Sequence, residues 1–212
     1  MRVVAFVDGF NLYHAIKNLG QPHLKWLDLW GLCSEYCPPP ALSLRGVYYF
    51  SAFATWRRGA YHRHRQYVKA LEATGVVPVM GSFKEKDREC FGCGDKWTAH
   101  EEKQTDVNIA LHLVTKATDD EFDRAILVSA DSDLVPAIEM MRVRAPRKSI
   151  RIVIPVGGYP CAELARAAGG TRACVPMGRV LIERHLLPAS VNDPHGQCVA
   201  VRPSRYDPPP TA

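Results

Sequence analysis

The sequence has no apolar run long enough to cross a membrane. An acidic residue, Asp8, also lies too close to the N-terminus for the apolar segment of a secretory signal peptide. From these two absences we expect a cytoplasmic protein without a membrane partner. The cysteine count of seven is odd, and in a reducing compartment we expect most of these residues to be free thiols.

Other motifs of common enzyme classes are missing. No serine or cysteine lies in a pattern that matches an activated nucleophile with its base, and Gly157-Gly158 lacks the rest of a dinucleotide-binding or P-loop motif. No internal repeat is visible. What is present is a chain of 212 residues with 47% hydrophobic residues, which is enough for one domain with a sizeable core. The net charge of +5 permits a polyanionic partner without requiring one.

Strand-like and helix-like patterns alternate along most of the chain. Short apolar runs occur at 3–7, 44–53, 76–80, 124–130, 150–155 and 172–176, and helical spacing is clearest at 11–19, 57–74, 101–117 and 132–143. This alternation predicts an α/β fold of three layers, with a central, mainly parallel sheet and helices on both faces.

The domain is expected to span residues 1–183. An irregular, glycine-containing insert is expected at about 82–100, just before the helix at 101–117. Residues 184–212 are rich in proline and poor in large apolar side chains, so this segment is expected to be a flexible tail, either disordered or loosely docked.

Four aspartates are expected at one edge of the sheet. Asp8 ends the first strand, and Asp131 and Asp133 follow the strand at 124–130. Parallel strands bring these three acids to the carboxyl edge, where open α/β sheets bind their ligands. Asp106 lies on the apolar stripe of the 101–117 helix near its N-terminus, with Glu102 one turn earlier, so we expect it to point toward the same edge.

Carboxylates gathered in this way repel one another unless a cation lies among them. An all-oxygen set suits Mg²⁺ or Mn²⁺, and ions held by carboxylates serve in the hydrolysis of phosphodiesters. We expect Asn11 to orient a water or a phosphate oxygen there. Taken singly, Asp131 or Asp133 is also typical of a helix cap, and Asp8 of a turn. Their shared edge favours the metal site.

Three stretches of the sequence resemble a known family. They are Val-Asp-Gly-Phe-Asn-Leu-Tyr at 7–13, Glu-Glu-Lys-Gln-Thr-Asp-Val-Asn at 101–108 and Leu-Val-Ser-Ala-Asp-Ser-Asp-Leu at 127–134. In order and spacing they are similar to the signature blocks of the NYN domain family, a PIN-like ribonuclease group that includes the LabA-like proteins. The resemblance covers about residues 1–180 and implies a Rossmann-like PIN fold and a metal-dependent ribonuclease. It implies that Asp8, Asp106, Asp131 and Asp133 form the acidic set, with Asn11 as their polar partner.

A Cys-x-x-Cys pair lies in the expected insert. Cys90 and Cys93, with His100 seven residues later, offer three ligands of the kind that a tetrahedral Zn²⁺ prefers. The fourth ligand is not evident, and the candidates elsewhere in the chain are Cys33, Cys37, His62 and His64. Two reduced cysteines in a glycine-rich loop, or redox chemistry, are the other interpretations.

Basic residues follow the second strand, at the same edge as the acids. Arg57, Arg58 and Arg63 have the aromatic neighbours Trp56 and Tyr61, a combination suited to a single-stranded backbone and its bases. A solvated helix face is the plainer interpretation.

The leading functional hypothesis is therefore an Mg²⁺- or Mn²⁺-dependent ribonuclease that acts on single-stranded RNA. The alternatives are an RNA-binding or regulatory module without turnover, and a metallohydrolase that acts on DNA or on phosphate esters. The oligomeric state is left open, with a homodimer among the options.

Overall fold

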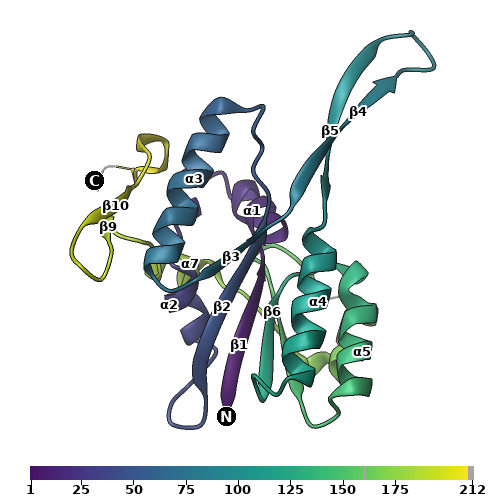
Figure 1. Cartoon of the computed structure of the whole chain (residues 1–212), viewed down its shortest axis with the longest axis vertical. Coiled ribbons are helices and arrows are strands. Elements are labelled where there is room, and N and C mark those ends of the chain that lie inside the picture. Colours follow the sequence, from purple (N-terminus) through teal and green to yellow (C-terminus); the bar gives the residue numbers. More distant parts are fainter. Residues whose placement is uncertain (160, 210–212) are drawn as a thin grey trace.

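The computed structural model describes residues 1–159 and 161–209 of the chain. At its centre is a six-stranded sheet with the order β3-β2-β1-β6-β7-β8, in which every pairing is parallel (Figure 1). Its strands are β1 (Arg2–Asp8), β2 (Ser43–Ser51), β3 (Val77–Met80), β6 (Arg124–Val128), β7 (Ser149–Ile154) and β8 (Cys174–Pro176). Each of the six strands expected from the sequence is present.

Helices cover both faces of this sheet. They are α1 (Gly9–Asn18), α2 (Leu29–Ser34), α3 (Arg58–Ala73), α4 (Thr105–Thr118), α5 (Val135–Arg144), α6 (Ala162–Ala168) and α7 (Arg179–Arg184), with short 3₁₀ turns at Pro22–Lys25, Ser132–Leu134, Thr171–Ala173 and Ser204–Tyr206. Along β1, Val3, Ala5 and Val7 pack with α1, α2 and α3, whereas Val4 and Phe6 pack with α4 and α5. The alternation of side chains along a strand thus builds two separate cores, and the expected three-layer architecture is confirmed. No described helix has both the length and the hydropathy that a membrane crossing requires.

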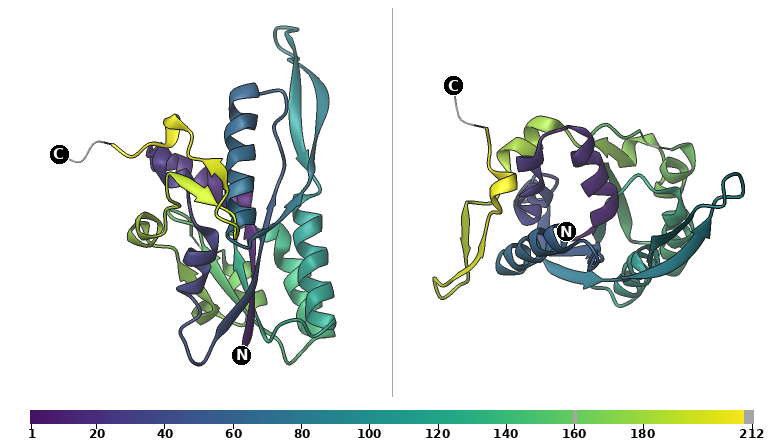
Figure 2. Two further views of the ribbon diagram at one scale, coloured as in Figure 1. Left: turned by 60° about the vertical axis from the view of Figure 1, so that its left-hand side comes forward. Right: turned by 90° about the horizontal axis from the view of Figure 1, so that it is seen from above.

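The expected irregular insert is instead a regular hairpin, formed by β4 (Ser82–Glu89) and β5 (Lys96–Lys103), that projects from the body (Figures 1 and 2). Its strands carry charged residues on both faces, so they lack the apolar alternation that reveals a half-buried strand. Cross-strand pairs take the place of a core: Arg88 and Lys86 of β4 both contact Glu101 of β5. The helix predicted from residue 101 accordingly begins only at Thr105.

Residues 184–209, expected as a flexible or loosely docked tail, form regular structure that packs on the domain. This segment forms a second hairpin, β9 (Ser190–Asn192) and β10 (Cys198–Val201), which lies beside α3 (Figure 2). Its few apolar side chains, Val191, Ala200 and Tyr206, are buried against Trp26 and Ala70. A segment too polar to form a core of its own is thus held in place by apolar surface that the domain supplies. Residues 210–212 of the expected tail lie outside the described residues.

The strand order reverses between β1 and β6. From β1 the chain builds outward to β2 and β3 on one side, and from β6 it builds outward to β7 and β8 on the other. Ligands of open α/β sheets bind beyond the carboxyl ends of the strands at such a switch point. β1 ends at Asp8, and β6 is followed by Ser129, Ala130 and Asp131, so three polar side chains lie at this position.

Candidate metal centre

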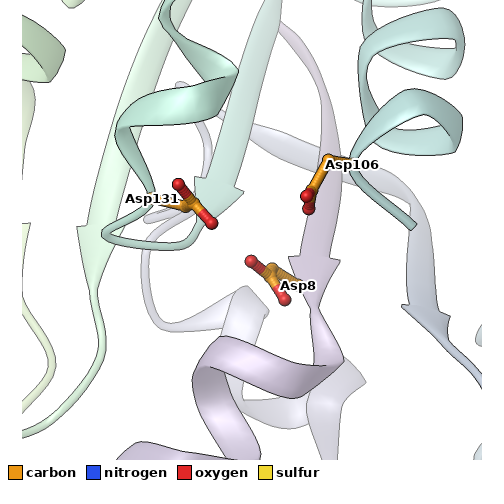
Figure 3. A group of neighbouring side chains, drawn as sticks. All are labelled: Asp8, Asp106 and Asp131. Atoms are coloured by element: carbon orange, nitrogen blue, oxygen red, sulfur yellow. The ribbon is translucent and has the colours of Figure 1, made fainter. Parts of the chain in front are cut away.

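Three aspartates meet at the switch point. Asp8 ends β1, Asp106 lies in the first turn of α4, and Asp131 lies just beyond β6 (Figure 3). Each offers one carboxylate oxygen, and these oxygens all lie within 4.8 Å of one another. The sequence analysis placed all three side chains at one edge of the sheet, and the structure brings them together there.

Asp8 is the buried member of the group, only 3% exposed. Its carboxylate accepts a hydrogen bond from the backbone N–H of Asn11 at 3.0 Å, which caps the start of α1, and another from the Ser129 hydroxyl at 2.9 Å. Burial raises the pKa of Asp8 to about 6, with smaller contributions from the Asp106 and Asp131 carboxylates; the two hydrogen bonds oppose this rise. Asp8 therefore carries a charge that is costly unless a cation compensates it.

Gly9 is needed beside Asp8 because of space rather than backbone conformation. A Cβ atom at this position would lie 2.6 Å from the carbonyl oxygen of Phe50 and equally close to the ring of Tyr49. The close packing of α1 on β2 therefore fixes the start of the helix, and with it the direction of the Asp8 side chain.

Two polar side chains that connect the elements of the centre have roles the sequence did not reveal. The Ser129 hydroxyl donates to Asp8 and accepts from the backbone N–H of Asp131 at 3.1 Å, so it joins the ends of β1 and β6. The Asn11 side-chain oxygen accepts from the backbone N–H of Ala130 at 3.1 Å. The expectation for Asn11 was contact with water or phosphate; in the structure its oxygen positions the loop that carries Asp131.

Asp106 reaches the centre through a sharp turn between β5 and α4. Gln104 has a φ of 81°, a left-handed conformation that is uncommon for a residue other than glycine. Glu102, expected one helical turn before Asp106, belongs to β5 and accepts a hydrogen bond from the backbone N–H of Thr105 at 3.0 Å. Burial raises the pKa of Asp106, and the neighbouring carboxylates of Asp131, Glu102 and Asp133 add to the effect.

Asp131 is a capping residue and also a member of the acidic group. Its carboxylate accepts from the backbone N–H of Asp133 at 2.9 Å and so caps the 3₁₀ turn, while the residue also belongs to the group of three. Asp133, expected as a fourth ligand, is exposed and lies outside that group. It remains close enough to affect the pKa of Asp106 through its charge.

The donor set fits a hard divalent cation. The three carboxylates supply oxygen ligands only, which is the chemistry that Mg²⁺ and Mn²⁺ prefer over softer ions. The raised pKa values of Asp8 and Asp106 show that the centre without an ion disfavours full ionisation. A bound cation removes this penalty, so Asp8, Asp106 and Asp131 are the residues that would hold it.

The structure does not bring together the expected zinc ligands. Cys90 and Cys93 lie at the tip of the β4–β5 hairpin, whereas His100 pairs with Glu85 four rungs below Glu89, a separation of about 13 Å along the strand. The His100 ring instead stacks on Trp56, with 3.7 Å between ring centroids. Cys33 and Cys37 are buried in the core and supply no further ligand. Within residues 1–159 and 161–209, no group of three possible metal ligands includes a cysteine or a histidine.

Two of the three expected arginines line one cavity. Arg57 and Arg63 line a cavity that also includes Gly9 and Glu102, which are neighbours of the aspartates in the chain. Arg58 is exposed and is not part of that lining. The structure thus separates three residues that the sequence grouped.

The chain is similar to a curated protein and to a solved structure. The chain is 26% identical over 194 residues to a 6-hydroxy-3-succinoylpyridine 3-monooxygenase of Pseudomonas putida, with 74% of this chain and 61% of the relative aligned. The chain thus spans about three fifths of the length of that relative. A solved structure of a protein of unknown function from Vibrio parahaemolyticus has a TM-score of 0.55 and 20% identity, and the match covers 88% of this chain and 96% of that one. This second likeness concerns the fold alone.

The family assignment rests on a match to most of the chain. The family model described as the NYN domain matches residues 2–168, which include all three aspartates of the centre and the whole β4–β5 hairpin. NYN domains are in general nucleases of the PIN-like group. The chain belongs to the NYN domain family.

Proposed function

We propose that this protein is a ribonuclease that requires Mg²⁺ or Mn²⁺ and hydrolyses phosphodiester bonds in single-stranded RNA. The observation that carries the proposal is the convergence of Asp8, Asp106 and Asp131, whose carboxylate oxygens lie within 4.8 Å of one another at the switch point of the sheet. A divalent ion held by these three residues would activate a water for attack and would compensate the negative charge on the scissile phosphate.

The chain's own residues hold the centre and bind the strand. Ser129 and Asn11 fix the Asp8 and Asp131 positions through the hydrogen bonds described above. Arg57 and Arg63, in the adjoining cavity, provide positive charge for the phosphates of the strand, and the aromatic lining provides surfaces for its bases.

The first test is the cleavage of a mixed-sequence single-stranded RNA by the wild type and by Asp131→Asn, in Mn²⁺, in Mg²⁺ and in EDTA. Asparagine is also a good cap, so this change removes the charge while the 3₁₀ turn keeps its hydrogen bond. We expect metal-dependent cleavage by the wild type and a loss of at least about 100-fold in the variant. Asp119→Asn, at the far end of α4, is the control and should cleave as the wild type does.

The outcomes separate the competing functions. RNA binding by the wild type without cleavage in either metal would contradict the proposal and favour a binding module without turnover. Cleavage of single-stranded DNA, but not RNA, would favour a DNA-directed metallohydrolase. Cleavage that persists in Asp131→Asn would mean that the centre lies elsewhere.

A second candidate function comes from the curated relative. Its name specifies a monooxygenase that acts at position 3 of 6-hydroxy-3-succinoylpyridine, and the cavity described above is lined by aromatic rings and cations. An activity of that kind is proposed here only as the alternative, and it is tested by product analysis of a hydroxypyridine carboxylate incubated with the protein, O₂ and NADH. A hydroxylated product, together with no cleavage of RNA, would favour it.

A further inference from the structure

A cavity of about 430 Å³ lies beside the metal centre, within the range of small-molecule sites. Its walls come mainly from α1, the end of β2 with the segment that leads into α3, α3 itself and the base of the β4–β5 hairpin, and two 3₁₀ turns add Lys25 and Tyr206. Gly9 and Glu102 belong to its lining, and they are neighbours of Asp8 and of Asp106. The aspartates themselves do not line the cavity, but Gly9 and Glu102 connect it to the side of the centre that carries Asp8 and Asp106.

One wall of the cavity is a preformed aromatic surface. The ring of Trp56 stacks on His100 with an interplanar angle of 17°, and the ring of Phe83 meets Trp56 edge-on at 4.7 Å. Phe83 also packs edge-on against Phe10 of α1 at 5.7 Å. Because these contacts join the hairpin to the body, the wall is built without a ligand. Binding of a planar ring to this wall therefore does not carry the entropic cost of ordering the aromatic side chains.

The charge of the lining is mainly positive. Lys17, Lys25, Arg57 and Arg63 all line the cavity, and Glu102 is its one acidic lining residue, already engaged with Thr105. The Nε of Arg63 is buried and has no hydrogen-bond partner among the described residues. A buried donor of this kind is costly unless an acceptor satisfies it, and the four cations of the lining favour an anionic acceptor.

We propose that this cavity binds one nucleotide as a unit, with its base against the aromatic wall and its phosphate near Arg63. The inference deepens the proposed nuclease function: it places a base-binding site next to the centre that would cleave the strand. Trp56 lines this cavity and packs against Phe83 of the hairpin. The site therefore depends on the contacts between the hairpin and the body.

The test is binding by isothermal titration calorimetry, in EDTA so that no cleavage takes place. AMP, GMP, CMP and UMP are titrated into the full chain, alongside adenosine and inorganic phosphate. We expect saturable 1:1 binding of at least one mononucleotide, and binding at least about fivefold weaker for both adenosine and phosphate alone. Binding of none of the four nucleotides would overturn the proposal.

Three variants locate the site. Tyr13 is exposed on α1 and lines the cavity, so Tyr13→Ala should weaken nucleotide binding about fivefold or more without loss of core packing. Arg63→Gln should weaken binding of the nucleotide but leave adenosine unchanged. Trp97→Ala is the control, because Trp97 is an exposed aromatic residue of the same hairpin that lies outside the lining. Wild-type affinity for the nucleotide in both Tyr13→Ala and Arg63→Gln would overturn the proposal.

Two further arms assign the source of the nucleotide and separate this inference from the nuclease proposal. A dinucleotide that binds at least about tenfold tighter than the mononucleotide would assign the site to a strand, and equal affinity would assign it to a free nucleotide. Nucleotide binding without RNA cleavage would leave the cavity proposal intact and contradict the nuclease. RNA cleavage without nucleotide binding would do the reverse.

Discussion

Ser129 is the residue that connects two of the three aspartates. It is fully buried, donates to Asp8 and accepts from the backbone of Asp131. Ser129→Ala leaves the Asp131 N–H without this acceptor and deprives Asp8 of a donor. We expect the free energy of unfolding in urea to fall by about 1–3 kcal/mol and the affinity for Mn²⁺ to fall as well.

The matched control for this prediction is Ser149→Ala. Ser149 starts the neighbouring strand β7 at the opposite end of the sheet, where its hydroxyl accepts from Arg124 at 3.1 Å. It should alter stability to a smaller extent and leave Mn²⁺ affinity unchanged. Equal effects of the two variants on Mn²⁺ affinity would show that Ser129 has no special connection to the centre.

The residues of the centre could be predicted from the sequence to different degrees. Asp8 and Asp131 follow apolar runs, and Asp106 lies on an apolar helical stripe, so the carboxyl edge of a parallel sheet places all three. Ser129 has no such signature, because a serine between a strand and an acid is equally typical of a turn. The exposure of Asp133 depends on the 3₁₀ turn that Asp131 caps, and spacing alone does not reveal that turn.

At the scale of the element, the C-terminal hairpin offers a direct comparison of a buried and an exposed position. Val191 of β9 is 5% exposed, whereas Val201 of β10 is 54% exposed. Val191→Asp places a charge in the cluster with Trp26 and Ala70, so we expect a loss of about 2–4 kcal/mol in the free energy of unfolding. Val201→Asp should change it by less than about 0.5 kcal/mol.

Urea unfolding followed by circular dichroism measures both variants. If residues 184–209 were a detached tail, neither valine would affect the unfolding of the domain, and the two variants would be indistinguishable. A difference between them would therefore establish that the hairpin is part of the folded unit.

Both hairpins were missed in the sequence for a common physical reason. Hydrophobic periodicity detects an element that carries its own apolar face. The β4–β5 hairpin is held by cross-strand ion pairs such as Arg88 with Glu101, and the C-terminal hairpin uses apolar surface supplied by Trp26 and Ala70. Neither kind of support appears in the composition of the segment itself. The strands and helices of the sheet do carry that signal, which is why their order and type could be predicted.

At the scale of the whole molecule, the buried acid links stability to pH and to metal. The pKa of Asp8 is about 6 in the folded chain and lies near its ordinary value of 3.8 in the unfolded chain. Between pH 3.8 and about 6, the Asp8 carboxyl group is protonated in the folded chain and ionised in the unfolded chain. The contribution of Asp8 to the free energy of unfolding therefore falls as pH rises from about 4 to 7, by up to about 3 kcal/mol.

This loss should be reversed by a divalent cation. An ion bound by the aspartates favours the ionised carboxylates, so Mn²⁺ should stabilise the protein little at pH 5 and progressively more toward pH 7.

The measurement is urea unfolding of the wild type and of Asp8→Asn, in EDTA and in Mn²⁺, across this pH range. In EDTA the variant should gain stability relative to the wild type as pH rises, because it has no carboxyl group to ionise, and it should respond weakly to Mn²⁺. Asp133→Asn, which changes an exposed acid outside the group of three, should keep most of the wild-type response to both. A constant difference between the wild type and Asp8→Asn across this pH range would mean that the carboxyl group of Asp8 titrates as it would in water, and the electrostatic argument for a cation at this centre would fail with it.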